Sequence, residues 1–223
     1  MTINNIFVEI FPALLQGLKV TVIVLILSAI CSYIFAFIAG LCRLSKNVFI
    51  RKFTGFYVEI FRGTSLIVQL FWLYYALPML FGIDLGSDLL TGVLAISLNF
   101  GAYMSEIVRG SILAVDKGQT EAAIALNMSS YQRMRLIILP QAIRMMLPEF
   151  GNYFILMLKA TSLVALIGMK DILYYGNILR STNLSQAPTV YILVLIFYFL
   201  IALPFIFINK KLEKMSKKGV AAS

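Results

Sequence analysis

Residues 20–41 form an uninterrupted apolar run without a charged side chain. A helix needs about 20 such residues to cross a hydrocarbon core about 30 Å thick, so this run restricts the chain to folds in which a segment spans a membrane. Four further runs are long and apolar, and three of them contain charged residues; they lie at residues 53–80, 89–107, 150–167 and 190–208. Only 13% of the residues are charged, against about 25% in soluble domains. The sequence therefore predicts a single all-α integral membrane domain, residues 1–223, with five transmembrane helices.

The distribution of positive charge predicts the orientation of these helices, because short cytoplasmic loops retain lysine and arginine. The positive residues gather in three segments: Arg43, Lys46, Arg51 and Lys52; Arg109, Lys117, Arg133, Arg135 and Arg144; and Lys210, Lys211, Lys214, Lys217 and Lys218. We therefore expect the N-terminus outside and the C-terminus in the cytoplasm, with the first run as an uncleaved anchor because most of its flanking charge follows it. The net charge of +9 is explained by topology and requires no nucleic-acid partner.

Missing residue types narrow the chemistry. The chain has no histidine and two cysteines, Cys31 and Cys42, both on the first predicted helix, so we expect no metal site and no bound cofactor. No paired nucleophile and base is present, and no GxxxxGK[ST] loop for binding ATP occurs. The chain is therefore not expected to be an enzyme, and any ATP hydrolysis would belong to a separate polypeptide.

Residues 111–149 form a long polar loop with helix signals. Asp116 precedes Gln119, and Ser129 precedes Gln132, at the spacing of a capping box. Two short helices are predicted, at roughly residues 117–126 and 130–139, with Asn127 at the joint, where a left-handed residue is favoured. The loop is predicted to be a rigid helical hairpin in the cytoplasm.

Four motifs in this order resemble one known family: Glu121-Ala122-Ala123 with Asn127 and residues 137–142 (IILPQA), residues 59–70 (EIFRGTSLIVQL), residues 102–110 (AYMSEIVRG) and residues 159–163 (KATSL). The chain is similar to the membrane subunits of bacterial ATP-binding cassette importers, in particular the polar amino acid permeases. Asn127 stands where that family usually has glycine, and the left-handed joint makes this exchange tolerable.

The resemblance implies a multi-pass subunit of the bacterial inner membrane, with specific partners. It pairs with a second permease, either another copy or a related chain, and receives a small polar zwitterion from an extracytoplasmic solute-binding protein. A groove on a separate ATPase subunit accepts the hairpin, so that Glu121, Ala122, Ala123 and Asn127 carry the coupling. The alternative for Glu121 is that it merely stabilises a helix N-terminus through the helix dipole.

Charged residues inside the predicted spans require partners or a cavity. Glu59 and Arg62 are three residues apart, as are Glu106 and Arg109, so each pair shares one helix face. We expect mutual ion pairs near the cytoplasmic ends, or else a contribution to an inner gate. Residues 63–65 (GTS) interrupt the second span; many relatives have proline where Ser65 stands, so we expect the break to persist with less kinking.

Lys159 lies near the membrane centre, where a lone cation needs an anion. The anion is either the carboxylate of a bound solute or an internal carboxylate, Glu59 or Glu106. Further polar residues, namely Thr161, Ser162, Asn99 and Gln69, would join Lys159 in a substrate pathway, or else bind helices to one another.

The solute class is only narrowed by the sequence. Ala160 stands where some relatives have an acidic residue, which argues against cationic amino acids. The aromatic residues Phe71, Trp72, Tyr74 and Tyr75 fit an interfacial belt, or a site for a delocalised cation. The RGTSLIVQLFW and EAAIALN segments look like those of the ectoine and hydroxyectoine permeases within the family. Two other classes stay open: a non-transporting membrane scaffold and an exporter.

Overall fold

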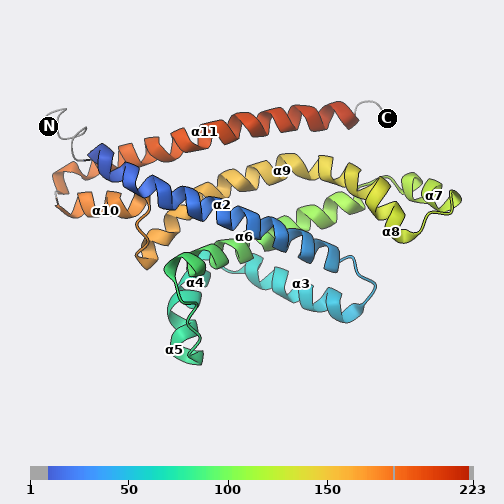
Figure 1. The fold of residues 1–223 in the computed structure, drawn as a ribbon, viewed down its shortest axis with the longest axis horizontal. Helices are drawn as coiled ribbons and strands as arrows, with labels where there is room; N and C mark the ends of the chain where they lie inside the picture. Colours follow the sequence, from blue (N-terminus) through green and yellow to red (C-terminus); the bar gives the residue numbers. More distant parts are fainter. Residues whose placement is uncertain (1–9, 183, 221–223) are drawn as a thin grey trace.

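The computed structural model describes residues 10–182 and 184–220, with side chains described up to residue 216, so the side chains of Lys217 and Lys218 lie outside it. Every secondary-structure element in these ranges is a helix. The helices form an elongated bundle (Figure 1). The start of α2 and all of α10 lie at one end of the bundle, and α7, α8 and the end of α11 lie at the other.

Four helical stretches are long and apolar enough to cross a membrane, and the count is five when a bent helix pair is included. The four are Phe11–Cys42, Asp88–Leu113, Ser130–Ile167 and Leu184–Ser216; the bent pair is Val48–Gly63 with Leu66–Phe81. This agrees with the predicted all-α membrane protein. The first helix, α2 (Phe11–Cys42), is longer than the predicted apolar run at residues 20–41 and begins nine residues earlier.

Helix α2 packs along α6 (Asp88–Leu113) over most of its length. Small residues bring the two helices close together: a Cβ on Gly101 would lie 2.7 Å from the Cβ of Phe35. The Ser97 hydroxyl, buried between the helices, donates to the Ser28 carbonyl at 3.3 Å. In lipid, the hydrophobic effect does not drive helices together. Helices there associate through close packing of small side chains and through hydrogen bonds such as those of hydroxyl groups.

The second span is broken into two arms. Helix α3 (Val48–Gly63) is followed by α4 (Leu66–Phe71), the π-helical segment η2 (Trp72–Ala76) and α5 (Leu77–Phe81), and the two arms meet at 108°. Figure 1 shows α4 and α5 turning away from the bundle. The break at residues 63–65 was expected, but with less kinking than the observed 108°. The continuous helix at 53–80 was not found, because Thr64 and Ser65 adopt extended conformations with ψ of 156° and 135°.

The hairpin and the fourth span are joined. Helix α7 (Lys117–Ala125) forms the first arm, and α8 (Ser130–Arg133) continues through the π-helical η3 (Met134–Ile138) into α9 (Leu139–Ala160) and the 3-10 helix η4 (Thr161–Ile167). Pro140 does not stop this helix, because the preceding residue, Leu139, donates its N–H to Met134 in a wider π turn. The second arm is therefore longer than the predicted 130–139.

The chain after η4 contains a helix that the sequence analysis did not predict, α10 (Ile172–Thr182), followed by η5 (Leu184–Gln186) and α11 (Ala187–Val220). Helix α10 packs on α2 and α11. A Cβ on Gly17 of α2 would lie 2.5 Å from the carbonyl carbon of Asp171 and from the backbone nitrogen of Ile172, so only glycine permits this approach.

Candidate translocation and coupling site

The broken second span leaves the carbonyl groups at the end of α3 without helical partners. Asn99 of α6 donates its side-chain amide to the Phe61 carbonyl at 2.9 Å and to the side-chain oxygen of Gln69 at 3.0 Å. The amide of Gln69, in α4, donates to the same carbonyl at 3.0 Å and to the Thr64 hydroxyl at 2.6 Å. Both amide side chains are buried. They therefore hold the two arms of the broken span together.

Two further hydroxyl groups complete this cap. The Tyr103 hydroxyl of α6 donates to the Arg62 carbonyl at 3.0 Å, and the Thr64 hydroxyl donates to the Ile60 carbonyl at 2.7 Å. Backbone carbonyls in lipid must be satisfied internally, so these side chains are what permits a helix end at this depth. Asn99 and Gln69 were expected either to line a substrate pathway or to bind helices to one another; in the single chain their amide groups do the latter.

Next to this cap, one carboxylate forms ion pairs with three arginines. Glu106 of α6 pairs with Arg43 at the end of α2, with Arg62 of α3 at 3.2 Å and with Arg109 at 3.0 Å. The Arg62 guanidinium also lies over the Tyr103 ring, 5.6 Å from its centre. The cluster joins three helices and contains two more positive than negative charges.

The predicted ion pairs are thus found in part. Arg109 pairs with Glu106 as expected, but Arg62 pairs with Glu106 rather than with Glu59, which is exposed and forms no ion pair in the described part of the chain. The reason is geometric: α3 ends at Gly63, and its last turn faces α6. Arg43 and Tyr103 were missed as members of this site. Tyr103 lies within the AYMSEIVRG motif, which was the available signal.

The hairpin joint has the geometry that its sequence predicts. Asn127 is left-handed, with φ of 61°, and is the only non-glycine residue of the described chain with positive φ. The Met128 N–H donates to Ala123 at 3.0 Å and the Asn127 N–H to Ile124 at 2.9 Å, which is the Schellman ending of a helix. Ser129 and Gln132 form the predicted capping box.

Asp116 caps α7, but through Gly118 at 2.6 Å rather than through Gln119. The Gln119 side chain instead accepts a hydrogen bond from Gln141 across the hairpin, at 3.3 Å. Of the four residues assigned to coupling, Glu121, Ala122 and Asn127 are exposed, whereas Ala123 is fully buried inside the hairpin. The small side chain of Ala123 therefore serves packing within this chain.

Lys159 lies in the last turn of α9 and is exposed on the surface of the protomer. In the described part of the chain it forms no ion pair, so neither Glu59 nor Glu106 is its partner here. The neighbouring hydroxyls bond to their own helix: Thr161 donates to Leu158 at 2.7 Å and Ser162 to Lys159 at 2.8 Å. In the described part of the single chain, Lys159 is therefore at the surface, whereas Asn99 and Gln69 are buried in the cap.

The aromatic run lies on η2 and its flanks. Tyr74 and Tyr75 have ring centres 4.7 Å apart, and the Tyr74 hydroxyl donates to Asp88 at 3.1 Å. Phe71, Trp72 and Tyr75 line a shallow apolar hollow of about 590 Å³ with Val68, Ala76, Met79 and Leu166. No group of histidine, cysteine or carboxylate side chains in the described residues could hold a metal ion.

Residues 32–218 match the family described as "Binding-protein-dependent transport system inner membrane component". The chain belongs to this family. This inner membrane component is 50% identical over 189 residues to a probable amino-acid ABC transporter permease protein, y4tF, of Sinorhizobium fredii (strain NBRC 101917 / NGR234), covering 83% of this chain and 77% of the relative. It is 36% identical over 207 residues to the glutamine transport system permease protein GlnP of Escherichia coli (strain K12), covering 92% and 94%.

A solved structure, described as an amino acid ABC transporter with histidines, resembles this inner membrane component along the whole chain. The TM-score is 0.85 at 34% identity, and the match covers 98% of this chain and 100% of the other. The family and this neighbour identify the chain as a transport component rather than an enzyme or a non-transporting scaffold.

Proposed function

We propose that this chain is the pore-forming permease subunit of a binding-protein-dependent importer for polar amino acids, powered by a separate ATP-binding cassette ATPase. The observation that carries the proposal is the similarity along the whole chain to an amino acid transporter of known structure. The relatives named above, described as amino-acid and glutamine permeases, favour the same solute class. None of them is described as an ectoine permease, so ectoine serves below as a competing solute.

The hairpin α7–α8 is the proposed contact with the ATPase. Its first arm, α7, and the joint at Asn127 lie outside the helices that could span a membrane, yet an apolar side chain is exposed there: Leu126 beside the left-handed Asn127 is 74% exposed. Exposed apolar residues on a rigid projection outside lipid favour contact with another protein. Glu121, exposed on the first arm, would offer that partner a carboxylate, and the Schellman ending and capping box keep the hairpin stiff.

Lys159 is the proposed contact with the solute carboxylate. Its ammonium has three donors and no internal carboxylate within ion-pair distance in the described chain, whereas the amides of Asn99 and Gln69 are occupied by the helix cap. Because Lys159 is exposed on the protomer, a second permease, either a copy of this chain or a related one, is needed to enclose it. An extracytoplasmic binding protein would deliver the zwitterion to the opposite face from the ATPase.

The test is uptake of radiolabelled glutamine into inner-membrane vesicles containing this chain, its ATPase and its binding protein, with and without ATP. Saturable, ATP-dependent uptake is expected, competed by other polar amino acids more strongly than by ectoine. Uptake competed by ectoine alone would replace the amino acid assignment, and uptake independent of ATP would exclude the coupling. A non-transporting scaffold would give no uptake at all.

A further inference from the structure

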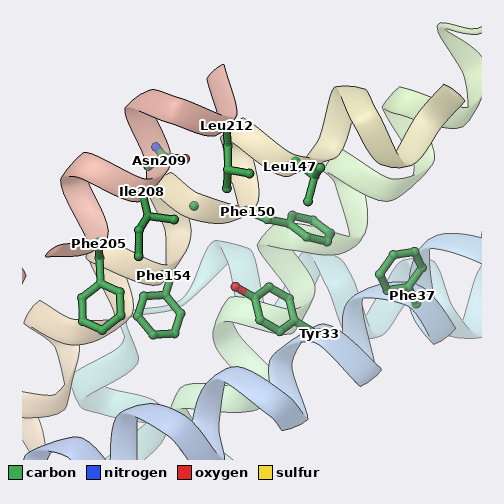
Figure 2. Close-up of a pocket in the computed structure, with 10 residues that line it drawn as sticks. Tyr33, Phe37, Leu147, Phe150, Phe154, Phe205, Ile208, Asn209 and Leu212 are labelled. Atoms are coloured by element: carbon green, nitrogen blue, oxygen red, sulfur yellow. The ribbon is translucent and has the colours of Figure 1, made fainter. Parts of the chain in front are cut away.

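Independently of the transported solute, we infer that the groove between α9 and α11 is a binding site for one anionic phospholipid. Its apolar part has a volume of about 440 Å³ and is lined by side chains from α2, α9 and α11: Tyr33, Phe37, Leu147, Phe150, Gly151, Phe154, Phe205, Ile208, Asn209 and Leu212. Figure 2 shows the rings of Tyr33, Phe154 and Phe205 around this space. The volume lies within the range of about 300–1,000 Å³ that is typical of ligand pockets.

The groove continues to a positively charged end. A second hollow of about 240 Å³ is lined by Arg144, Leu147, Leu212, Met215 and Ser216. It shares Leu147 and Leu212 with the apolar part, so the two hollows are adjacent. From Phe205 to Ser216, helix α11 advances by eleven helical rises, about 16 Å along its axis. This is about half of a 30 Å hydrocarbon core, the depth of one leaflet.

The deep part of the groove contains one amide side chain, Asn209, whose nitrogen is engaged and whose buried Oδ1 has no hydrogen-bond partner in the described part of the chain. Asn209 donates its amide to Asn152 at 2.7 Å, and its side chain packs so closely on Gly151 that a Cβ there would lie 2.5 Å from the Asn209 Cγ. The wall is otherwise formed by aromatic and aliphatic side chains. A hydrocarbon chain is therefore the chemistry that fits this part of the groove.

The positively charged end of the groove has the chemistry to bind an anion. Arg144 is exposed and has no ion-pair partner in the described part of the chain, and its backbone carbonyl accepts a hydrogen bond from the Ser216 hydroxyl at 3.0 Å. Lys211 is exposed on α11 next to this end but lines neither hollow. One acidic residue, Glu213, lies in this part of α11. A guanidinium with free donors binds a phosphate strongly, and the apolar part continues from it toward the bilayer centre.

The test uses brominated lipids, which quench tryptophan on contact. The chain contains one tryptophan, Trp72, so a Trp72→Phe background allows a single reporter to be placed. Ile208→Trp reports on the groove, and Ile192→Trp is the matched control, because the two isoleucines lie on α11 and are 56% and 59% exposed. Each full-length variant is incorporated into phosphatidylcholine bilayers with increasing mole fractions of dibrominated phosphatidylglycerol or dibrominated phosphatidylcholine of the same chain length.

At position 208, half-maximal quenching is expected at a mole fraction at least about fivefold lower for phosphatidylglycerol than for phosphatidylcholine, since one basic side chain near the headgroups contributes about this factor. At position 192 the two lipids should quench alike. Adding Arg144→Gln should reduce the preference at position 208, whereas Arg135→Gln, which removes an exposed arginine from the hairpin, should not.

Equal quenching by the two lipids at position 208, or a preference that survives Arg144→Gln, would refute the anionic site. Quenching at 192 but not at 208 would show that a second protein chain covers the groove, and would also refute it. Phe205→Trp provides the same measurement if Ile208→Trp does not fold.

Discussion

Asn99 donates its side-chain amide to the side-chain oxygen of Gln69 at 3.0 Å, and both amides meet at the Phe61 carbonyl. This pair joins α6 to both arms of the broken second span. Asn99→Leu and Gln69→Leu should each lower the free energy of unfolding by about 1–3 kcal/mol, because each leaves buried polar groups without partners.

Thermal unfolding of the detergent-solubilised protein checks this, and the double variant is the control. Because the two side chains share one network, the double variant should be less destabilised than the sum of the single variants, with a coupling of about 0.5–3 kcal/mol. Additive losses would show that the two amides act separately.

Glu106 is the single carboxylate among three arginines, so Glu106→Gln should destabilise the protein by about 1–3 kcal/mol through loss of charged hydrogen bonds and repulsion among the arginines. The matched control is Glu59→Gln, which removes an exposed carboxylate without an ion pair in the described chain. Adding Arg43→Gln to Glu106→Gln should restore part of the lost stability. An equal loss for the two glutamate variants would contradict the central role of Glu106.

Gly17→Ala should destabilise the protein by about 1–3 kcal/mol, because the added Cβ would meet the backbone of Asp171 and Ile172 at 2.5 Å. Gly55→Ala is the matched helical control, since nothing lies within 4 Å of its Cβ position. The control should be neutral or stabilising, as alanine is the better helix former. Melting temperatures of the two variants, measured side by side, distinguish these outcomes.

Asp171 predicts a pH dependence of stability. Burial raises its pKa from 3.8 to about 6, against hydrogen bonds from the Tyr174 N–H and the Tyr198 hydroxyl that favour the charged form. The unfolded chain therefore loses this proton at lower pH than the folded chain. The contribution of Asp171 to the free energy of unfolding is therefore largest below about pH 4. It falls by about 3 kcal/mol in total as the pH rises to about 6, and it changes little at higher pH.

Denaturant titrations at pH 4, 5, 6 and 7 measure this contribution as the difference between wild type and Asp171→Asn. That difference should fall as the pH rises. Asp84→Asn, which changes an exposed carboxylate in the loop before α6, should show no such trend. A flat difference for Asp171→Asn would mean that its pKa is the same in the folded and unfolded states.

Within the proposed transport function, Glu121→Ala should lower ATP-dependent uptake several-fold while the amount of chain in the membrane stays the same. Glu121 is exposed and forms no ion pair in the described part of the chain, so its loss should leave the bundle intact. Lys117→Ala, on the same arm, is the matched control and should leave uptake nearly unchanged. Normal uptake with Glu121→Ala would exclude Glu121 from coupling.

In the same assay, Lys159→Met should lower the affinity for amino acids without lowering the melting temperature, because Lys159 has no internal ion pair in the described chain. Lys170→Met, which removes an exposed lysine beyond η4, serves for comparison. A loss of stability with Lys159→Met would indicate a structural partner for the ammonium and would contradict its role in binding solute.

Structural features that depend on residues close together in the sequence could be predicted. The left-handed Asn127 and the capping box of Ser129 follow from local hydrogen bonding, and the five apolar runs follow from hydropathy. The two π turns could have been suspected, because η2 and η3 each end two residues before a proline, Pro78 and Pro140. In both, the residue before the proline bonds five residues back.

Contacts between distant residues were not predictable from one sequence. Arg43 and Glu106 are 63 positions apart, and Asn99 and Gln69 are 30 apart. In lipid, the faces toward protein and toward lipid are both apolar, so helix periodicity does not reveal which helices meet. The role of Asn99 as a cap for a broken helix depends on such a meeting, as does the approach of Asp171 to Gly17.

The stretch from Ser130 to Ile167 runs for 38 residues without leaving the helical state. It places the hairpin capping box and Lys159 on one rod, about 44 Å apart along its axis. Helices α2, α6 and α11 grip the α9 part of this rod. Within the proposed transport function, a sideways push on the hairpin arm would swing the Lys159 arm in the opposite direction, as in a lever. Its softest points are the π turn at Met134–Ile138 and Pro148, so the distance from each of these to the grip sets how much of the push reaches the far arm.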